Sequence, residues 1–215
     1  FDLTLEGSLL EGAEARTLNE ATFNDGTLTL NFGEPVETLN AGTPYIIKSN
    51  KTVYADLIIN NANEWDDFAS AVNDGNSYSG KVVLLAADIV TETMVGTNNK
   101  KFKGTFDGCG HTLTFTKNTS DQYCAPFRFV ENATIMNLHT DGTIYTNKKF
   151  SAGLVAHTQY TTVIKNCWSS VNINSTVSGD GSHGGLVATL SGSGNTITID
   201  GCVFDGSFAT TNGTR

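Results

Sequence analysis

The stretch APFRFVENATIMNLHTDGTI (residues 125–144) begins a pattern that the chain repeats twice more. The second copy is AGLVAH (152–157) with IKNCWSSVNI (164–173), and the third is GGLVAT (184–189) with IDGCVFDGSF (199–208). The copies start at residues 125, 152 and 184, so they lie 27 and 32 residues apart. The positions that match are apolar, as in Ile135, Ile164 and Ile199. Self-similarity at this period is typical of stacked supersecondary units.

Each copy consists of short runs rich in Ile, Val and Thr, separated by Gly, Asn, Asp and Ser, which predicts strands and turns. One such unit cannot bury its apolar face alone, so equivalent side chains must stack on those of the next unit. The pattern therefore predicts an all-β fold, a right-handed parallel β-helix, in which Ile135, Ile164 and Ile199 form one internal ladder. An antiparallel β-sandwich also has short strands at regular intervals, but it has no reason to repeat one apolar pattern three times.

The GLV segments, the I-x-N-L or I-x-N-C segments after them, and FKGTFDGCGHTL (102–113) resemble the GLUG-type repeats of large extracellular proteins of gut Bacteroidetes and Firmicutes. The resemblance covers about residues 57–208. It implies a β-helix on a secreted or cell-surface bacterial protein, and it implies no single activity. Cys109 departs from the pattern, because such repeats usually have Asn there, a residue that tolerates a left-handed turn. The turn geometry at Cys109 is therefore left open.

Residues 1–56 are predicted to form a separate antiparallel β domain. A turn signal, FNDGT (23–27), precedes a run with alternating apolar residues, and a second turn precedes the strand that ends at Lys48. FDLTL (1–5) and TLNAGTPYIIK (38–48) resemble a small β domain that often precedes such β-helices and has more strands before the position of Phe1. The resemblance implies a longer polypeptide with flanking domains and an incomplete first domain. The β-helix then occupies residues 57–215.

One good helix is expected, over about residues 63–73. Its apolar residues are spaced as on one face of a helix, at Trp65, Phe68, Ala69 and Val72. Asn63 is the candidate N-cap, and Asn73-Asp74-Gly75 ends the segment. The open end of a solenoid needs a cover, so we expect this helix to cap the β-helix with Trp65 as its largest plug. The alternative is that Trp65 stacks on a ligand.

The composition bears on partners and location. The chain of 215 residues carries a formal net charge of −9, with 13 Lys and Arg against 22 Asp and Glu. Nucleic acids and anionic membranes require clustered basic side chains, so neither is an expected partner. No stretch approaches the roughly 20 apolar residues of a membrane helix, and FDLTLEG (1–7) lacks the features of a signal peptide. An extracellular or cell-surface location therefore requires export and anchoring signals outside these residues.

The sequence lacks the common motifs of catalysis, phosphate binding and metal binding: HExxH, GxSxG, a P-loop and CxxC. Its four histidines occupy different positions in their repeats, so stacking does not gather them into one column. No catalytic residue, cofactor or metal ligand is predicted.

An enzyme is nevertheless the rival class: a polysaccharide-degrading β-helix, or an accessory region of such an enzyme or of a surface protease. Asp141 and Asp205 are equivalent, with Ser170 between them, which predicts a separation of about 9.6 Å. That distance suits an inverting glycosidase only by accident, so we interpret both as solvated turn residues. A carboxylate-lined cleft with Arg128 or the Lys148-Lys149 pair would favour the enzyme. Arg128 has no equivalent in the other repeats, and we interpret it as an outward strand residue between Phe127 and Phe129.

Function is indicated by class only: a non-catalytic extracellular module of a bacterial surface protein, serving as a rigid stalk or an adhesin-like segment. Glycans or host glycoproteins are the expected partners, because a filled solenoid has no interior pocket for a small apolar ligand. Alternation places Trp168 outward in a column with His139 and Val203, so Trp168 and His139 are the candidate ligand contacts. Packing of Trp168 against a neighbouring turn or domain is the alternative.

The four cysteines pose a separate question. Cys167 and Cys202 occupy equivalent positions one repeat apart, where parallel side chains make the disulfide dihedral awkward although the Cα separation allows a bond. We expect both to be buried free thiols. An extracellular location permits disulfides, so the state of Cys109 and Cys124 stays open.

Overall fold

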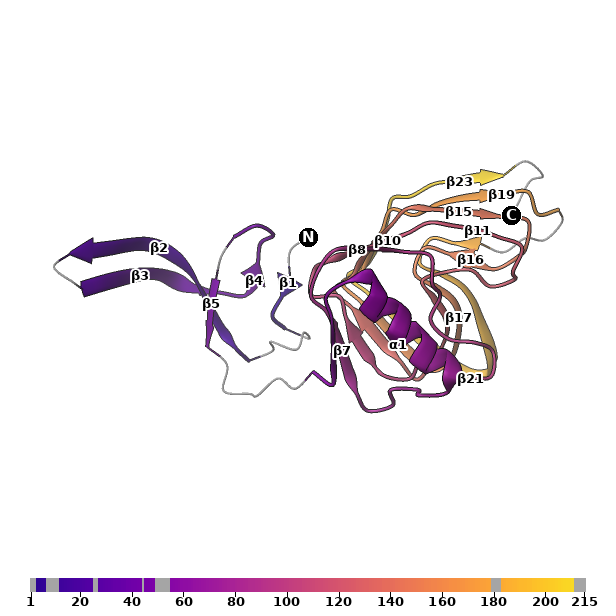
Figure 1. Ribbon diagram of the computed structural model, residues 1–215, viewed down its shortest axis with the longest axis horizontal. Helices are drawn as coiled ribbons and strands as arrows, with labels where there is room; N and C mark the ends of the chain where they lie inside the picture. Colours follow the sequence, from indigo (N-terminus) through magenta and orange to yellow (C-terminus); the bar gives the residue numbers. More distant parts are fainter. Residues whose placement is uncertain are drawn as a thin grey trace. The chain divides into compact units, whose positions relative to one another are not determined.

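The computed structural model of this chain describes residues 3–6, 12–24, 27–43, 45–48, 55–178 and 183–210. The chain divides into two compact units, Phe1–Tyr54 and Ala55–Arg215. The described residues are mostly β, with one helix (Figure 1). The sequence-based expectation of an all-β chain is therefore confirmed at the level of class.

The first unit is antiparallel. Strand β1 (Leu3–Thr4) pairs with β4 (Thr38–Leu39), and a separate sheet has the order β3, β2, β5, formed by Thr27–Val36, Glu14–Asn24 and Tyr45–Lys48. Asn24 pairs with Thr27 at the end of the long hairpin, as the FNDGT turn signal predicts, while the central Asp25 and Gly26 fall outside the described residues. Leu18 and Leu30 are exposed, so the long hairpin leaves apolar side chains open to solvent.

In the second unit every strand pair among the described residues is parallel. One sheet contains β6 (Leu57–Ile59), β7 (Val82–Leu85), β9 (Thr105–Asp107), β12 (Phe127–Glu131), β13 (Thr134–Met136), β17 (Val155–Lys165) and β21 (Val187–Asp200). A second contains β8 (Ile89–Thr91), β10 (Thr112–Phe115), β14 (His139–Asp141), β18 (Trp168–Ser169) and β22 (Val203–Phe204). A third contains β11 (Lys117–Thr119), β15 (Thr143–Thr146), β19 (Asn172–Ser175) and β23 (Phe208–Thr210), and β16 (Ser151–Ala152) pairs with β20 (His183–Gly184).

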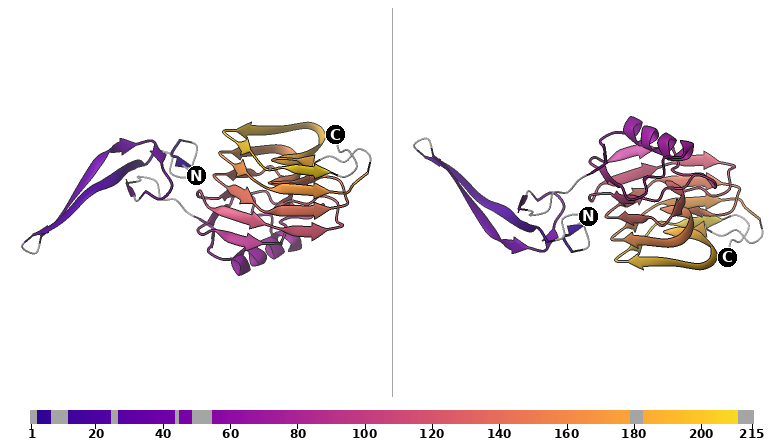
Figure 2. Two further views of the ribbon diagram at one scale, coloured as in Figure 1. Left: turned by 90° about the horizontal axis from the view of Figure 1, so that it is seen from above. Right: turned by 90° about the horizontal axis from the view of Figure 1, so that it is seen from below.

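The chain visits the three large sheets in the same order in each repeat, and each visit places a strand beside its equivalent from the previous repeat. Figure 2 shows the result as strands stacked in successive layers, with the helix beside the first strands and the last strands at the opposite end. Successive repeats therefore share three sheets. The largest buried cluster includes Phe106, Ile135 and Leu138, and a second cluster includes Phe115, Ile144 and Ile173.

The expected isoleucine ladder is present in register, because Ile135 pairs with Ile164 and Ile164 with Ile199. Its burial is not uniform. Ile135 and Ile164 are fully buried, whereas Ile199 is 48% exposed. The prediction that all three are internal is wrong for Ile199, because no described strand pairs with the outer edge of β21.

Helix α1 (Ala62–Asp74) lies within one residue of the predicted bounds at each end. The predicted N-cap is wrong: Asn61, not Asn63, accepts a hydrogen bond from the Glu64 backbone N–H at 3.1 Å. The Glu64 side chain in turn accepts the backbone N–H of Asn60 at 2.6 Å. The side chains of Asn61 and Glu64 thus each bind a backbone N–H at the start of the helix that has no partner within the helix. The helix ends at Gly75, whose φ of 118° suits glycine.

Trp65 is a core residue. It is fully buried and meets the rings of Phe68, Phe106 and Phe127 edge-on, each at a centroid distance of 5.7 Å. Its indole N–H donates to the Thr93 carbonyl at 3.0 Å, so burial leaves the polar atom paired. The alternative that Trp65 stacks on a ligand is therefore wrong.

A left-handed turn recurs at one corner of the second unit, at Cys109, Asn137, Asn166 and Gly201, with φ between 50° and 60° at each. The Asn137 side chain donates to Asp107 at 3.0 Å, and the Asn166 side chain donates to Asn137 at 3.4 Å. Cys109 adopts the same conformation without an amide side chain, and its backbone N–H donates to Asp107 at 2.8 Å. The turn geometry that the sequence left open is thus the left-handed one.

We expect Asn137→Ala to lower the free energy of unfolding by about 2–4 kcal/mol, because alanine is strained in the left-handed region and Asp107 loses a buried hydrogen bond. Urea denaturation followed by circular dichroism measures the change. Asn118→Ala, at an exposed strand position, serves as the control and should stay within about 0.5 kcal/mol of the unaltered chain. Equal effects of the two substitutions would contradict the structural role of the corner.

Candidate functional site

Two outward faces of the second unit carry side chains suited to binding. One is the histidine–tryptophan column, which consists of His139, Trp168 and Val203 on the second sheet. The other is a groove on the third sheet, which is centred on Tyr145.

The histidine–tryptophan column has the register that the sequence predicts, because His139 pairs with Trp168 and Trp168 with Val203. The His139 and Trp168 rings stack, with centroids 4.2 Å apart and planes 16° from parallel. Trp168 is half-buried. The structure therefore brings the two candidate contact residues together, and it does so through their ring faces.

Hydrogen bonds fix the polar atoms of this column. His139 Nε2 lies 3.0 Å from the Ser170 hydroxyl, and Nδ1 lies 3.2 Å from the Thr112 hydroxyl. Trp168 Nε1 donates to an Asp205 carboxylate oxygen at 2.7 Å. Hydrogen bonds from Trp168 and Ser170 lower the pKa of Asp205, and burial lowers the pKa of His139. The column is thus an imidazole, whose charged form burial disfavours, stacked on an indole whose N–H is already bound.

This geometry limits what Trp168 can do. A sugar platform needs an open ring face. One face of Trp168 is covered by His139, and Val203 is its register neighbour on the other side. The residue that covers this face is the register neighbour His139 in the same sheet, and packing of Trp168 against a neighbouring turn or domain stays a prediction.

The possible enzymatic groups are engaged elsewhere. Asp205 accepts the Trp168 indole N–H, and Asp141 accepts the Gly142 backbone N–H at 2.7 Å. Arg128 donates to the Gln122 carbonyl at 3.0 Å and lies over the Phe129 ring. Each of these side chains therefore has a bond to its own surroundings.

Other polar clusters have structural partners. Glu131 forms ion pairs with Lys103 at 2.6 Å and Lys101 at 3.6 Å, and His111 lies 3.2 Å from Asp88. Within the described ranges, no group of three or more His, Cys, Asp or Glu side chains is placed to hold a metal ion. The described helix has neither the length nor the apolar character needed to cross a membrane.

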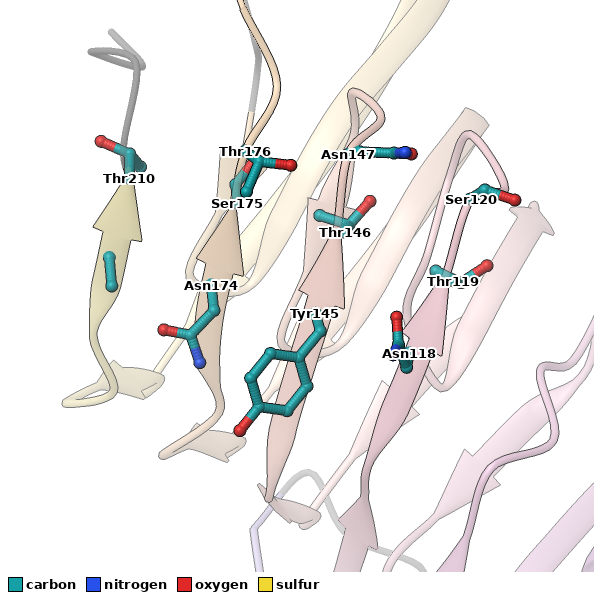
Figure 3. A pocket seen from close by; sticks show the side chains of 11 residues that line it. Asn118, Thr119, Ser120, Tyr145, Thr146, Asn147, Asn174, Ser175, Thr176 and Thr210 are labelled. Atoms are coloured by element: carbon teal, nitrogen blue, oxygen red, sulfur yellow. The ribbon is translucent and has the colours of Figure 1, made fainter.

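The second face is the Tyr145 groove, a hollow of about 750 Å³ on the outer side of the third sheet (Figure 3). Its lining comes from β11, β15, β19 and β23 and the turns after the first three of them, and the described residues in it are all uncharged: Asn118, Thr119, Ser120, Tyr145, Thr146, Asn147, Asn174, Ser175, Thr176, Ala209 and Thr210.

Three residues of the groove form one outward row, because Asn118 pairs with Tyr145 and Tyr145 with Asn174. The Tyr145 side chain is 49% exposed. Figure 3 shows its ring broadside, with Asn118 and Asn174 on either side. The ring face is open, unlike that of Trp168.

Sequence reasoning did not identify this groove. The available signal was small: Tyr145 and Asn174 each follow a matched apolar position, Ile144 and Ile173, and so had to point outward. Asn118 lies in a part of the chain that the repeat pattern does not align, so its place beside Tyr145 follows only from the strand pairing.

All four cysteines are free, including Cys109 and Cys124. Cys167 is buried, but Cys202 is only half-buried, so the expectation that both are buried is wrong for Cys202. The Cys167 backbone N–H points at the Cys202 sulfur at 3.4 Å. Hydrogen bonds from Cys167 lower the pKa of Cys202, whereas burial raises the pKa of Cys124 to about 12.

We expect iodoacetamide to label Cys202 first in the folded protein at pH 8, because it is only half-buried and hydrogen bonds from Cys167 lower its pKa. Cys109 is exposed as a residue, but it should react slowly, since desolvation of its sulfur and the nearby Asp107 raise its pKa to about 12, and buried Cys124 and Cys167 should stay unlabelled. Mass spectrometry without reductant gives the order, and all four should react in denaturant. Absence of label at Cys167 and Cys202 in denaturant would instead reveal a disulfide.

The stacked rings offer a second test. We expect Trp168 fluorescence to change with a midpoint below about pH 6.5, the ordinary value for histidine, because burial disfavours the charged form of His139. The unfolded chain then binds a proton at His139 more readily than the folded chain does. The contribution of His139 to stability is therefore complete above about pH 6.5 and decreases as the pH falls below it. His139→Gln should abolish the transition. A midpoint at or above 6.5 would contradict the burial argument.

The chain was compared with family models, curated proteins and solved structures, and none of the three comparisons gave a match. The function of this chain must therefore be inferred from its own residues and their arrangement.

Proposed function

We propose that the second unit is a right-handed parallel β-helix of GLUG-type repeats, with α1 covering one end, and that it serves as a non-catalytic module of a bacterial surface protein. The observation that carries this proposal is the in-register pairing of equivalent residues across successive repeats, seen in Ile135, Ile164 and Ile199. Three sheets visited in a constant order are what a β-helix requires. Right-handed connection is the general preference for parallel strands.

A stack of this kind is suited to a stalk or an adhesin-like segment. Its inner side chains are packed against those of the next repeat, and its strands are joined by continuous backbone hydrogen bonds, so it resists bending. The outer faces differ between repeats and are free to vary. An extracellular or cell-surface location follows from the resemblance to GLUG-type repeats, and glycans or glycoproteins are the proposed partners because a filled solenoid has no interior pocket for a small apolar ligand.

A polysaccharide-degrading enzyme is the second candidate, and the Tyr145 groove on an outer face is the observation in its favour. Glycoside hydrolysis by the usual route needs two carboxyl groups beside the bond that is cleaved. The described lining of the groove contains none. The non-catalytic module is therefore the better supported proposal.

We expect the full chain to release no reducing sugar from mucin or plant polysaccharides above a heat-denatured sample. Reducing-sugar assays over pH 5 to 8 provide the measurement. Asp141→Asn and Asp205→Asn should behave as the unaltered protein does, because both carboxylates serve local hydrogen bonds. Sugar release that either substitution abolishes would overturn the non-catalytic proposal.

A further inference from the structure

We infer that the Tyr145 groove is a binding site for a neutral glycan, with the Tyr145 ring as its platform and the Asn118 and Asn174 amides as its polar contacts. The inference rests on the proposed function, since it supplies the contact surface that an adhesin-like module needs. It assigns that contact to the third sheet rather than to the histidine–tryptophan column.

The ring of Tyr145 has the properties of a sugar platform. It is 49% exposed, and no aromatic ring among the described residues stacks on it. Figure 3 shows the ring broadside within the groove, so its face is presented to a ligand. A pyranose has one side made largely of C–H groups, and such a surface packs favourably on the negative face of an aromatic ring.

The amides on either side supply the polar half of the contact. Asn118 and Asn174 flank Tyr145 in the strand register, and neither side chain has a hydrogen-bond partner among the residues that the structure describes. Each amide offers both donors and an acceptor. Neighbouring sugar hydroxyls are also both donors and acceptors, so an amide can bind two of them at once.

The lining indicates a neutral ligand. A uronic or sialic acid carries a carboxylate, which proteins recognise with Arg or Lys. The described lining contains neither, and the chain as a whole carries a net charge of −9, which repels acidic polymers. The same absence of charge disfavours nucleic acid and acidic peptides.

The dimensions suit a short segment of a chain rather than one sugar. Asn118, Tyr145 and Asn174 lie on three adjacent strands, which span about 10 Å at the usual strand spacing. That length matches two linked sugar rings. The volume of about 750 Å³ lies within the range of sites for molecules of this size.

The experiment measures binding of the full chain to gluco-, manno-, xylo- and galacto-oligosaccharides on an array, with polygalacturonate and sialyllactose as acidic probes. Isothermal titration with the strongest neutral oligosaccharide then compares the variants. We expect Tyr145→Ala to weaken binding by about tenfold or more, and Asn174→Ala by a smaller factor. Tyr145→Phe should bind nearly as the unaltered chain does, because the platform is kept.

Tyr160→Ala is the matched control, since Tyr160 is also 49% exposed but lies in the first large sheet of the second unit. Thermal denaturation checks that each variant is folded. Loss of binding in Tyr145→Ala with retention in Tyr160→Ala and Trp168→Ala supports the inference. Unchanged binding by folded Tyr145→Ala, or preference for the acidic probes, overturns it.

Two outcomes separate this inference from the proposed function. If Trp168→Ala loses binding and Tyr145→Ala does not, the groove assignment fails while an adhesin-like module stands. If the chain binds no neutral oligosaccharide above a control protein, the groove assignment also fails, and a stalk without ligand stands. Sugar release from polysaccharides, by contrast, would overturn the non-catalytic proposal whichever residue binds.

Discussion

Parallel pairing of equivalent residues in successive repeats is the constraint on which the second unit depends. Each strand finds its hydrogen-bond partners in the strand about one repeat away, and the same pairing places like side chains on top of one another. Phe106, Ile135 and Ile164 are consecutive in this way and are all fully buried. The core is therefore continuous along this column, and a change in register of one residue would turn each of these side chains to the outer face.

The corner and the helix complete that core in different ways. At the corner the chain adopts a left-handed conformation, which Asn137 and Asn166 tolerate better than most residues with a Cβ, and the two side chains bond to each other along the stack. At the first strands, α1 contributes the indole of Trp65 to a cluster of phenylalanine rings. Edge-on ring contacts and a bonded indole N–H stabilise this packing without leaving a polar atom unpaired.

The two outward faces show how one architecture produces different surfaces. On the second sheet a large ring follows another in register, and the two stack on each other, which covers the faces that a ligand would use. On the third sheet Tyr145 stands between two asparagines, so its ring remains open. Capacity for binding thus depends less on which aromatic residue is present than on what its register neighbours are.

The sequence by itself determined the features that follow from periodicity. The spacing of the repeats predicted parallel strands with Ile135, Ile164 and Ile199 in one register, and the spacing of apolar residues predicted the helix and the buried face that carries Trp65. These features are local or repeat along the chain, so the one-dimensional pattern contains them.

Only the tertiary structure decided which side chains are neighbours. The N-cap at Asn61, the exposure of Ile199 and the half-buried state of Cys202 depend on which groups are present at an element's edge. The covered ring of Trp168 and the open ring of Tyr145 depend on neighbours about 30 residues away in sequence. All of these features have the same physical reason. Alternation along a strand fixes whether a side chain points outward, but its contacts are made across strands, with residues that are distant in sequence.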